Sequence, residues 1–265
     1  MSVLEAIIYG LVQGLTEFLP VSSSGHLALF NAFIFQRSGT GGFDEPLTMS
    51  ILVHVASLLA ILFAFRREVL ALLTRDRRLG LFILAATVPA MIAGLLFHDA
   101  LEQINEQPVL VAILLMMTGL VLAAGEVFAR RRRELCAEQE MSFWQAISVG
   151  VAQAFALLPG ISRSGTTISA ARALGLTREG AVRFSFLLAI PAIAAAGGYE
   201  SLEIFKNGFP NDIGFVAASA GFIASFVSSL LAIMLLLNLV RRVGLWVFSP
   251  YLWVIGSAAI LYFGR

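Results

Sequence analysis

The sequence is poor in charge and in cysteine, and each shortage excludes a class of protein. Charged residues make up 13% of its 265 residues and apolar residues 58%, whereas about a quarter of an average soluble domain is charged. The low charge excludes a disordered chain, a cytosolic enzyme and a protein that binds nucleic acid. The single cysteine, Cys136, excludes an intramolecular disulfide framework and a cysteine-rich metal site.

Long apolar segments take the place of the missing charge. Six of them are long enough to cross a bilayer as helices, and they cover residues 48–65, 79–97, 109–128, 182–199, 213–239 and 245–263. Two further apolar stretches, 3–35 and 142–174, are interrupted at residues 19–25 and 158–165 by proline, glycine and serine. Each interruption should end one helix and begin another. We therefore predict an all-α polytopic membrane protein with six transmembrane helices and two re-entrant helical hairpins, in a single membrane domain over residues 1–265.

The basic residues are distributed unevenly between the two sides of this predicted topology. One side has fourteen arginines, namely Arg66, Arg67, Arg75, Arg77, Arg78, Arg130, Arg131, Arg132, Arg133, Arg172, Arg178, Arg183, Arg241 and Arg242. The other side has Arg37, Lys206 and Arg265, together with eight acidic residues. The positive-inside rule makes the arginine-rich side cytoplasmic. The first hairpin then opens on the extracytoplasmic side and the second on the cytoplasmic side.

The two interrupted stretches resemble each other at a constant offset of 140 residues. The identical pairs are Ala6/Ala146, Ile7/Ile147, Gly10/Gly150, Gln13/Gln153, Ser22/Ser162, Ser24/Ser164 and Gly25/Gly165. We interpret residues 1–128 and 142–265 as two repeats of inverted topology, joined by a cytoplasmic linker at residues 129–141. The alternative is a coincidence of small and apolar residues, which are common in any two membrane helices.

The polar residues within the apolar stretches should surround one pocket. The second arm of each hairpin starts inside the membrane, where its helix N-terminus presents unpaired N–H groups that bind phosphate oxygens. A charged side chain such as that of Arg163 costs free energy inside the membrane, and we expect it to bind a phosphate group. Its alternative role is an ion pair that holds the hairpins together. Beside it lie the small and hydroxyl residues Gly160, Ser162, Ser164, Gly165, Thr166 and Thr167.

The first hairpin supplies acidic and nucleophilic groups. Gln13 and Glu17 are four residues apart and share a helix face, so they could ligate a divalent cation. Glu17 could also act as an acid or base, or simply neutralise Arg163. Ser23 and His26 share a face if the second arm is helical from Ser23, which is the arrangement of a nucleophile and its base. The alternative is ordinary capping of a helix start.

Two motifs carry a resemblance to a known family. Residues 13–26 read QGLTEFLPVSSSGH, and residues 159–167 read PGISRSGTT. Both resemble the motifs of the undecaprenyl-pyrophosphate phosphatase family, the bacitracin-resistance membrane proteins of bacteria. The resemblance implies that the terminal phosphate is removed from undecaprenyl pyrophosphate, which gives the monophosphate lipid carrier for cell-wall synthesis. It also implies the bacterial inner (plasma) membrane, a pocket open to the extracytoplasmic side, and a divalent cation, Mg²⁺ or Ca²⁺. Assembly as a homodimer is a further expectation.

The resemblance also implies roles for single residues. The family's catalytic group falls on Glu17, Ser23, His26 and Arg163. The expected substrate-binding residues are Gln13, Ser22, Ser24, Gly25, Gly160, Ser162, Ser164, Gly165, Thr166 and Thr167. Glu17 and Gln13 are the candidate metal ligands, although Gln13 occupies a position where many members of the family have glutamate. This departure weakens a site in which two carboxylates share one ion and leaves Glu17 as the dependable acid.

More than one mechanism and more than one function fit these residues. Ser23 could attack the terminal phosphorus with His26 as base, or water could attack directly with His26 or Glu17 as base. A transporter or flippase for a phosphorylated prenyl lipid is the alternative function, because inverted repeats with broken helices are also a transporter architecture. Membrane phosphatases with a phosphohistidine intermediate are excluded, because their lysine motif and second histidine are missing: the only lysine is Lys206, and no histidine follows His98.

Overall fold

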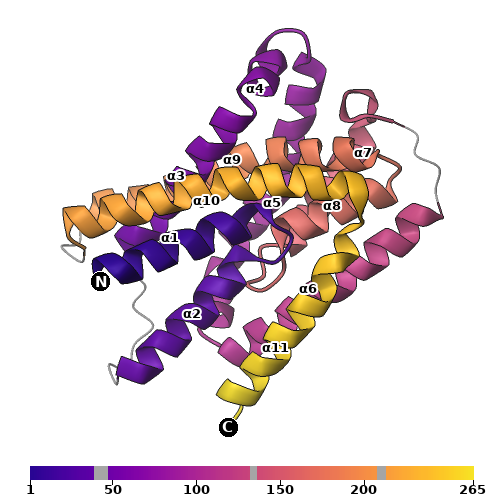
Figure 1. Ribbon diagram of the computed structural model, residues 1–265. Coiled ribbons are helices and arrows are strands. Elements are labelled where there is room, and N and C mark those ends of the chain that lie inside the picture. Colours follow the sequence, from indigo (N-terminus) through magenta and orange to yellow (C-terminus); the bar gives the residue numbers. More distant parts are fainter. Residues whose placement is uncertain (39–46, 132–135, 208–212) are drawn as a thin grey trace.

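The computed structural model describes residues 1–38, 47–131, 136–207 and 213–265, with backbone alone at 34–38, 47 and 199–207. Throughout these ranges the regular structure is helical, apart from one isolated bridge between Cys136 and Leu176. The elements are α1 (Val3–Phe18), α2 (Ser23–Ser38), α3 (Leu47–Ala64), α4 (Arg66–Leu73), α5 (Arg77–Asn105), α6 (Pro108–Arg130), η1 (Glu138–Glu140), α7 (Phe143–Phe155), α8 (Arg163–Ala173), α9 (Arg178–Asn207), α10 (Phe215–Arg242), η2 (Leu245–Phe248) and α11 (Ser249–Phe263) (Figure 1).

The predicted membrane segments all coincide with helices. In the described part of the chain, five helical segments are long and apolar enough to cross a membrane: α5, α6, α9, α10 and η2 with α11. A sixth is added if α3 and α4, which are bent by 77° at their junction, count as one span. Large apolar side chains also point outward, as Leu96 on α5 and Val254 on α11 do at 72% and 67% exposure. A helix that is apolar on its outer face as well belongs in lipid, so the prediction of a multi-pass helical membrane protein is confirmed.

The predicted interruptions separate helices as expected. α1 ends at Phe18 and α2 begins at Ser23, while α7 ends at Phe155 and α8 begins at Arg163. α1 packs chiefly against α10, and α7 chiefly against α5, which Figure 1 shows for the long parallel course of α1 and α10. Both contacts are close because glycine lies at them: Gly10 meets the α10 backbone at Gly221, and Gly150 meets the α5 backbone at Ala86.

The same hydrogen bonds recur in the two interrupted stretches. α1 begins with a capping box of Ser2 and Glu5, and α7 begins with a capping box of Ser142 and Gln145. These pairs also differ by 140 residues in number. In addition, the Gly25 N–H donates to Ser22 Oγ over 3.3 Å, and the Gly165 N–H donates to Ser162 Oγ over 3.1 Å. The two stretches therefore share hydrogen bonds at their starts and at the beginning of their second arms. The interruptions themselves differ in backbone, since φ is 69° at Ser22 and −72° at Ser162.

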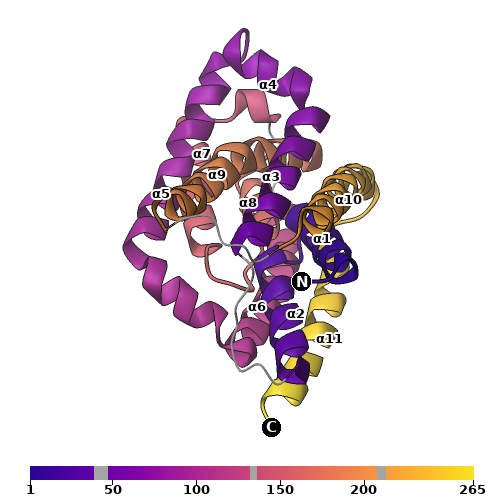
Figure 2. The same ribbon diagram turned by 90° about the vertical axis from the view of Figure 1, so that its left-hand side faces the viewer.

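Tertiary contacts bring the two interruptions together in the interior. A side chain at Gly25 would collide with the Gly160 backbone, and Ser164 Oγ donates to the Leu19 carbonyl over 3.0 Å. Thr118 on α6 holds the second interruption in place, because its hydroxyl donates to the Gly160 carbonyl over 2.8 Å and accepts from the Ser162 N–H over 3.0 Å. α6 packs against both α8 and α2, and Figure 2 shows α6 beside and behind α2.

Parts of the predicted loops lie outside the described residues. They are residues 132–135 of the linker 129–141, with Arg132 and Arg133, and residues 39–46 and 208–212. The side chains of Arg37 and Lys206 lie outside them as well. Cys136 is joined to the α8–α9 turn, since the Thr177 N–H donates to its carbonyl over 3.0 Å. Burial raises the pKa of the Cys136 thiol, which disfavours the reactive thiolate.

Candidate active site

Glu17 is the centre of a buried polar cluster. Its side chain lies in the last turn of α1 and is 8% exposed. One carboxylate oxygen, Oε1, accepts a hydrogen bond from Arg163 Nη2 in an ion pair between the two interrupted stretches. The other, Oε2, accepts from Gln13 Nε2 over 3.0 Å and from Ser23 Oγ over 2.5 Å. Three hydrogen bonds from an arginine, an amide and a hydroxyl keep a buried carboxylate ionised and fixed in place.

Arg163 reaches this cluster from the start of α8. Its Nη2 is bound to Glu17, while Nη1 is buried and has no hydrogen-bond partner among the described residues. A buried guanidinium normally uses its donors, so Nη1 is available for an additional oxygen ligand. The predicted ion pair between Glu17 and Arg163 is therefore present, and the arginine still retains a donor that could bind an anion.

The structure pairs Ser23 with Glu17 instead of with His26. α2 is helical from Ser23 as predicted, but the Ser23 hydroxyl donates to the carboxylate. His26 lies further along α2, where Nδ1 is 2.8 Å from the Ser22 carbonyl and Nε2 is 2.8 Å from the Tyr251 hydroxyl on α11. Spacing along a helix places Ser23 and His26 near each other, but it does not determine which acceptor the serine selects.

The other predicted substrate-binding residues of the interruptions are serines, a threonine and glycines, and they differ in what they contact. Within each interruption two serine hydroxyls lie close together: Ser22 Oγ is 3.3 Å from Ser24 Oγ, and Ser162 Oγ is 3.2 Å from Ser164 Oγ. Thr167 points elsewhere, because its hydroxyl bonds to the Arg163 carbonyl and to Ser185. The three remaining positions are Gly25, Gly160 and Gly165. A side chain at any of them would collide with neighbouring atoms. Gly160 also has a φ of 100°, which favours glycine.

Two further buried polar atoms of the predicted site lack partners within the described part of the chain. They are Gln13 Oε1 and Thr166 Oγ1. Gln13 Oε1 is an oxygen on the same side chain that bonds Glu17, so it and the carboxylate could together hold a hard cation such as Mg²⁺ or Ca²⁺. Mg²⁺ commonly takes one or two protein oxygens and completes its shell with substrate phosphate and water. The donor set therefore fits a divalent cation of this kind.

A small cavity of about 50 Å³ lies at the meeting point of the interruptions. It is lined by Thr16, Glu17, Ser22, Ser23, Ser24, Ala156, Ile161, Ser162 and Arg163. Sequence reasoning did not single out Thr16, Ala156 or Ile161, which are common residue types in apolar stretches. It also gave no site role to Tyr251, or to His54 on α3, whose ring interacts electrostatically with Glu17. Both come from distant spans, and only the folded structure brings them near.

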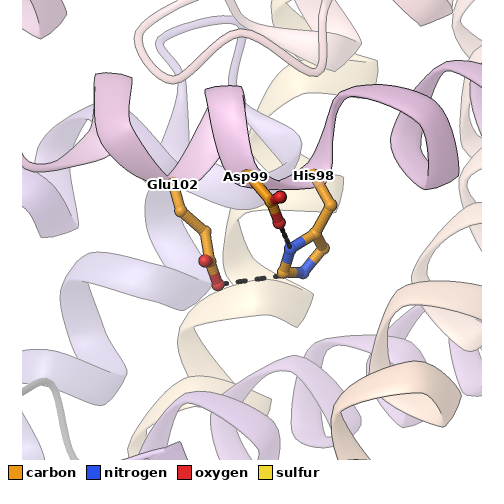
Figure 3. Close-up of side chains that lie close together, drawn as sticks. All are labelled: His98, Asp99 and Glu102. Atoms are coloured by element: carbon orange, nitrogen blue, oxygen red, sulfur yellow. Dashed lines mark ion pairs between the residues drawn. The ribbon is translucent and has the colours of Figure 1, made fainter.

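A second group of titratable side chains lies near the end of α5 (Figure 3). The ligand atoms of His98, Asp99 and Glu102 are within 4.8 Å of one another. However, Asp99 lies 3.7 Å from the ring nitrogen Nδ1 and Glu102 lies 3.7 Å from the other nitrogen, Nε2. A metal ion at either nitrogen would have only one carboxylate beside it. Exposure of 97% for Asp99 and 68% for Glu102 further indicates solvated ion pairs.

Comparison with known proteins extends over almost the whole chain. The family model described as bacitracin resistance protein BacA matches residues 6–258. The chain is 37% identical to undecaprenyl-diphosphatase 1 of Shouchella clausii, with 99% of this chain and 97% of that protein covered. It is 38% identical to undecaprenyl-diphosphatase 2 of Stutzerimonas stutzeri, with 99% of each covered. A third relative, undecaprenyl-diphosphatase of Alkaliphilus metalliredigens, is 36% identical over 99% of each chain.

Proposed function

Since the chain belongs to the bacitracin resistance protein BacA family, we propose that it is a membrane phosphatase that hydrolyses undecaprenyl pyrophosphate. The products are undecaprenyl phosphate and inorganic phosphate. The reaction returns the lipid carrier to cell-wall synthesis. The description of the family as bacitracin resistance proteins connects this reaction with resistance to that antibiotic. The observation that carries the proposal is the buried cluster of Glu17, Ser23 and Arg163, in which a nucleophile, an acid and an anion-binding group meet.

The two halves of the chain form an inverted-topology repeat in this proposal. Its support is the shared pattern at Ser2 and Ser142 and at the two interruptions. The packing supports it as well, because α1 of the first half lies against α10 of the second, and α7 of the second lies against α5 of the first. Such an exchange is what a two-fold relation between halves produces. The stretches 3–35 and 142–174 are then re-entrant hairpins, beside six spans.

The proposed site opens to the extracytoplasmic side of the bacterial inner membrane. The fourteen arginines on the opposite side support this orientation. The prenyl tail of the substrate remains among the lipids, and its diphosphate head enters between the interruptions. There Arg163 Nη1 binds a phosphate oxygen, since it is a buried donor without a partner among the described residues. The N-termini of α2 and α8 add positive dipole ends on the same anion.

Ser23 is the proposed nucleophile, and Glu17 receives its proton. The Ser23 hydroxyl already donates to Glu17 Oε2 over 2.5 Å, so the proton moves along an existing hydrogen bond as Oγ bonds to the terminal phosphorus. The bond from that phosphorus to the bridging oxygen breaks, and undecaprenyl phosphate leaves with the bridging oxygen. Arg163 remains paired with Glu17 and neutralises the charge that develops on the transferred group.

Water then releases phosphate from Ser23. His26 takes a proton from the water at Nε2, the water oxygen bonds to phosphorus, and the bond from phosphorus to Ser23 Oγ breaks. Glu17 returns its proton to Oγ, and His26 later loses its own to solvent. When a divalent cation is bound at Gln13 and Glu17, it supplies further charge neutralisation at the phosphate oxygens. The cation and a homodimeric assembly stay predictions.

Phosphate release by the purified protein tests this function. A prenyl diphosphate in detergent should yield inorganic phosphate with the wild type, and alanine variants of Glu17, Ser23, His26 and Arg163 should be strongly impaired. Addition of a chelator tests the cation. If the wild type releases no phosphate, the phosphatase proposal is wrong, and transfer of a labelled prenyl phosphate across vesicles would then test the flippase alternative.

The covalent step has its own test. Substrate labelled in the terminal phosphate, mixed with enzyme and quenched in acid, should leave label on Ser23, which peptide mass spectrometry locates. Ser23→Ala should lower kcat at least about a hundredfold, because the nucleophile is lost. Retention of most activity in Ser23→Ala together with its loss in His26→Ala would instead support direct attack by water.

A further inference from the structure

Tyr251 contacts His26 in a manner that the motifs do not predict. Its hydroxyl lies 2.8 Å from His26 Nε2, and the two rings are almost parallel, at 4° with centroids 5.7 Å apart. Tyr251 belongs to α11, at the far end of the chain from α2. Its side chain is 44% exposed, so the contact with His26 joins α11 to α2 near the surface of the helix bundle.

The other side of the imidazole determines its tautomer. His26 Nδ1 lies 2.8 Å from the Ser22 carbonyl oxygen, and a carbonyl oxygen can only accept a hydrogen bond. The proton of the neutral ring must therefore be on Nδ1, which leaves the lone pair on Nε2. The same carbonyl also accepts the His26 backbone N–H over 3.2 Å, so the first turn of α2 holds it beside the ring. Nε2 is thus the basic nitrogen, and Tyr251 is its hydrogen-bond donor.

We propose that Tyr251 is a positioning residue that holds His26 with its basic nitrogen Nε2 directed away from α2, ready to accept a proton from water. This inference rests on the proposed function. A phenol both donates and accepts hydrogen bonds, so Tyr251 donates to the neutral ring and accepts from the protonated one. The attacking water displaces the phenolic O–H from Nε2 and donates its proton there, and the phenolic oxygen accepts the new N–H once the water oxygen has bonded to phosphorus and left the ring. The ring keeps one orientation throughout the step.

Tyr262 provides a matched control on the same helix. It also lies on α11 and is 47% exposed, and its ring packs at 5.5 Å from that of Phe33 on α2. Both tyrosines therefore join α11 to α2 through an aromatic contact, but only Tyr251 is bonded to His26. Replacement of either by phenylalanine retains the ring and removes the hydroxyl alone.

The kinetic test compares Tyr251→Phe with Tyr262→Phe in the phosphate-release assay. Loss of one hydrogen bond to the catalytic ring should lower kcat roughly tenfold in Tyr251→Phe, with KM unchanged because the phenol does not bind substrate. Tyr262→Phe should retain the wild-type kcat and KM. Equal activity of Tyr251→Phe and wild type, or a change in KM alone, would overturn the assignment.

A spectroscopic test does not depend on activity. The chain has three histidines, and ¹⁵N NMR distinguishes their tautomers, with the His26 signal identified by its loss in His26→Gln. The wild type should show His26 protonated at Nδ1, and Tyr251→Phe should shift the His26 Nε2 signal while His54 and His98 keep theirs. An Nε2-protonated ring in the wild type, or an unshifted signal in the variant, would refute the proposal. A wild type that releases no phosphate but gives the expected spectra would refute only the proposed function.

Discussion

The two interrupted stretches share hydrogen bonds at equivalent positions but differ in their chemistry. Ser22 and Ser162 cap the second arms in the same way, yet the residues around them diverge. At the offset of 140, Glu17 corresponds to Leu157, Ser23 to Arg163 and His26 to Thr166. The first stretch therefore supplies the acid and the hydroxyl, and the second supplies the positive charge. One site results because the stretches meet, and neither half contains a complete set of groups.

The largest expected effect comes from breaking the ion pair between Glu17 and Arg163, which joins the two stretches. Arg163→Ala should lower kcat roughly a thousandfold, as loss of an arginine that stabilises phosphoryl transfer does. It also leaves Glu17 buried without its cation, which should cost about 3 kcal/mol of stability. Phosphate release and thermal unfolding in detergent measure the two effects. Arg163→Lys is the control that keeps the charge, and it should recover stability more than activity. An active, equally stable Arg163→Ala would contradict the central ion pair.

A smaller effect is expected where the stretches touch through glycine. Alanine at Gly25 would meet the Gly160 backbone and Leu115, so Gly25→Ala should destabilise the protein by roughly 1–3 kcal/mol. Gly198 on α9 has open space where a methyl group would be added, with no atom of the described residues within 4 Å, and Gly198→Ala should be neutral or slightly stabilising. Thermal unfolding of both variants checks the difference. Similar stability of the two would show that the interruptions are less closely packed than the contact at Gly25 indicates.

The smallest effect tests how similar the stretches are. Ser142→Ala removes the hydroxyl that caps α7 and should cost about 1 kcal/mol. Ser2→Ala removes the corresponding cap of α1 and should cost a similar amount, because both caps are exposed capping boxes. Both variants should keep the wild-type kcat. A large loss of activity in either would mean that the caps influence the site.

Much of the architecture was predictable because it depends on local composition. The apolar segments became helices, since lipid requires internal hydrogen bonds throughout a span. The interruptions at Pro20 and Pro159 separated helices, because there proline, which lacks a backbone donor, is combined with serine and glycine. Proline alone does not end a helix, since α5 and α9 continue through Pro89 and Pro191. The bend of 77° between α3 and α4 was not predicted. The apolar residues of α3 continue up to Arg66, and no proline or glycine at this point indicates that the helix bends.

Only part of the candidate site was predictable, and most of the bonds within it were not. Glu17, Ser23 and Arg163 were expected together, and they are in contact. The expected serine–histidine pair is not formed, because the Glu17 carboxylate is the stronger acceptor and lies within reach of Ser23. The contacts of Tyr251 and Thr118 were not predicted, because a single hydroxyl group on a membrane helix belongs to no recognisable sequence pattern.

Sequence alone determined the helices, their interruptions and the unusual polar residues within them, because those depend on hydropathy and on backbone chemistry over a few residues. Only the tertiary structure decided which groups bond to each other. Glu17 and Arg163 are 146 residues apart in the chain, and His26 and Tyr251 are 225 apart. Contacts at such separation depend on how the helices pack, and the close approach at Gly10, Gly25 and Gly150 sets that packing.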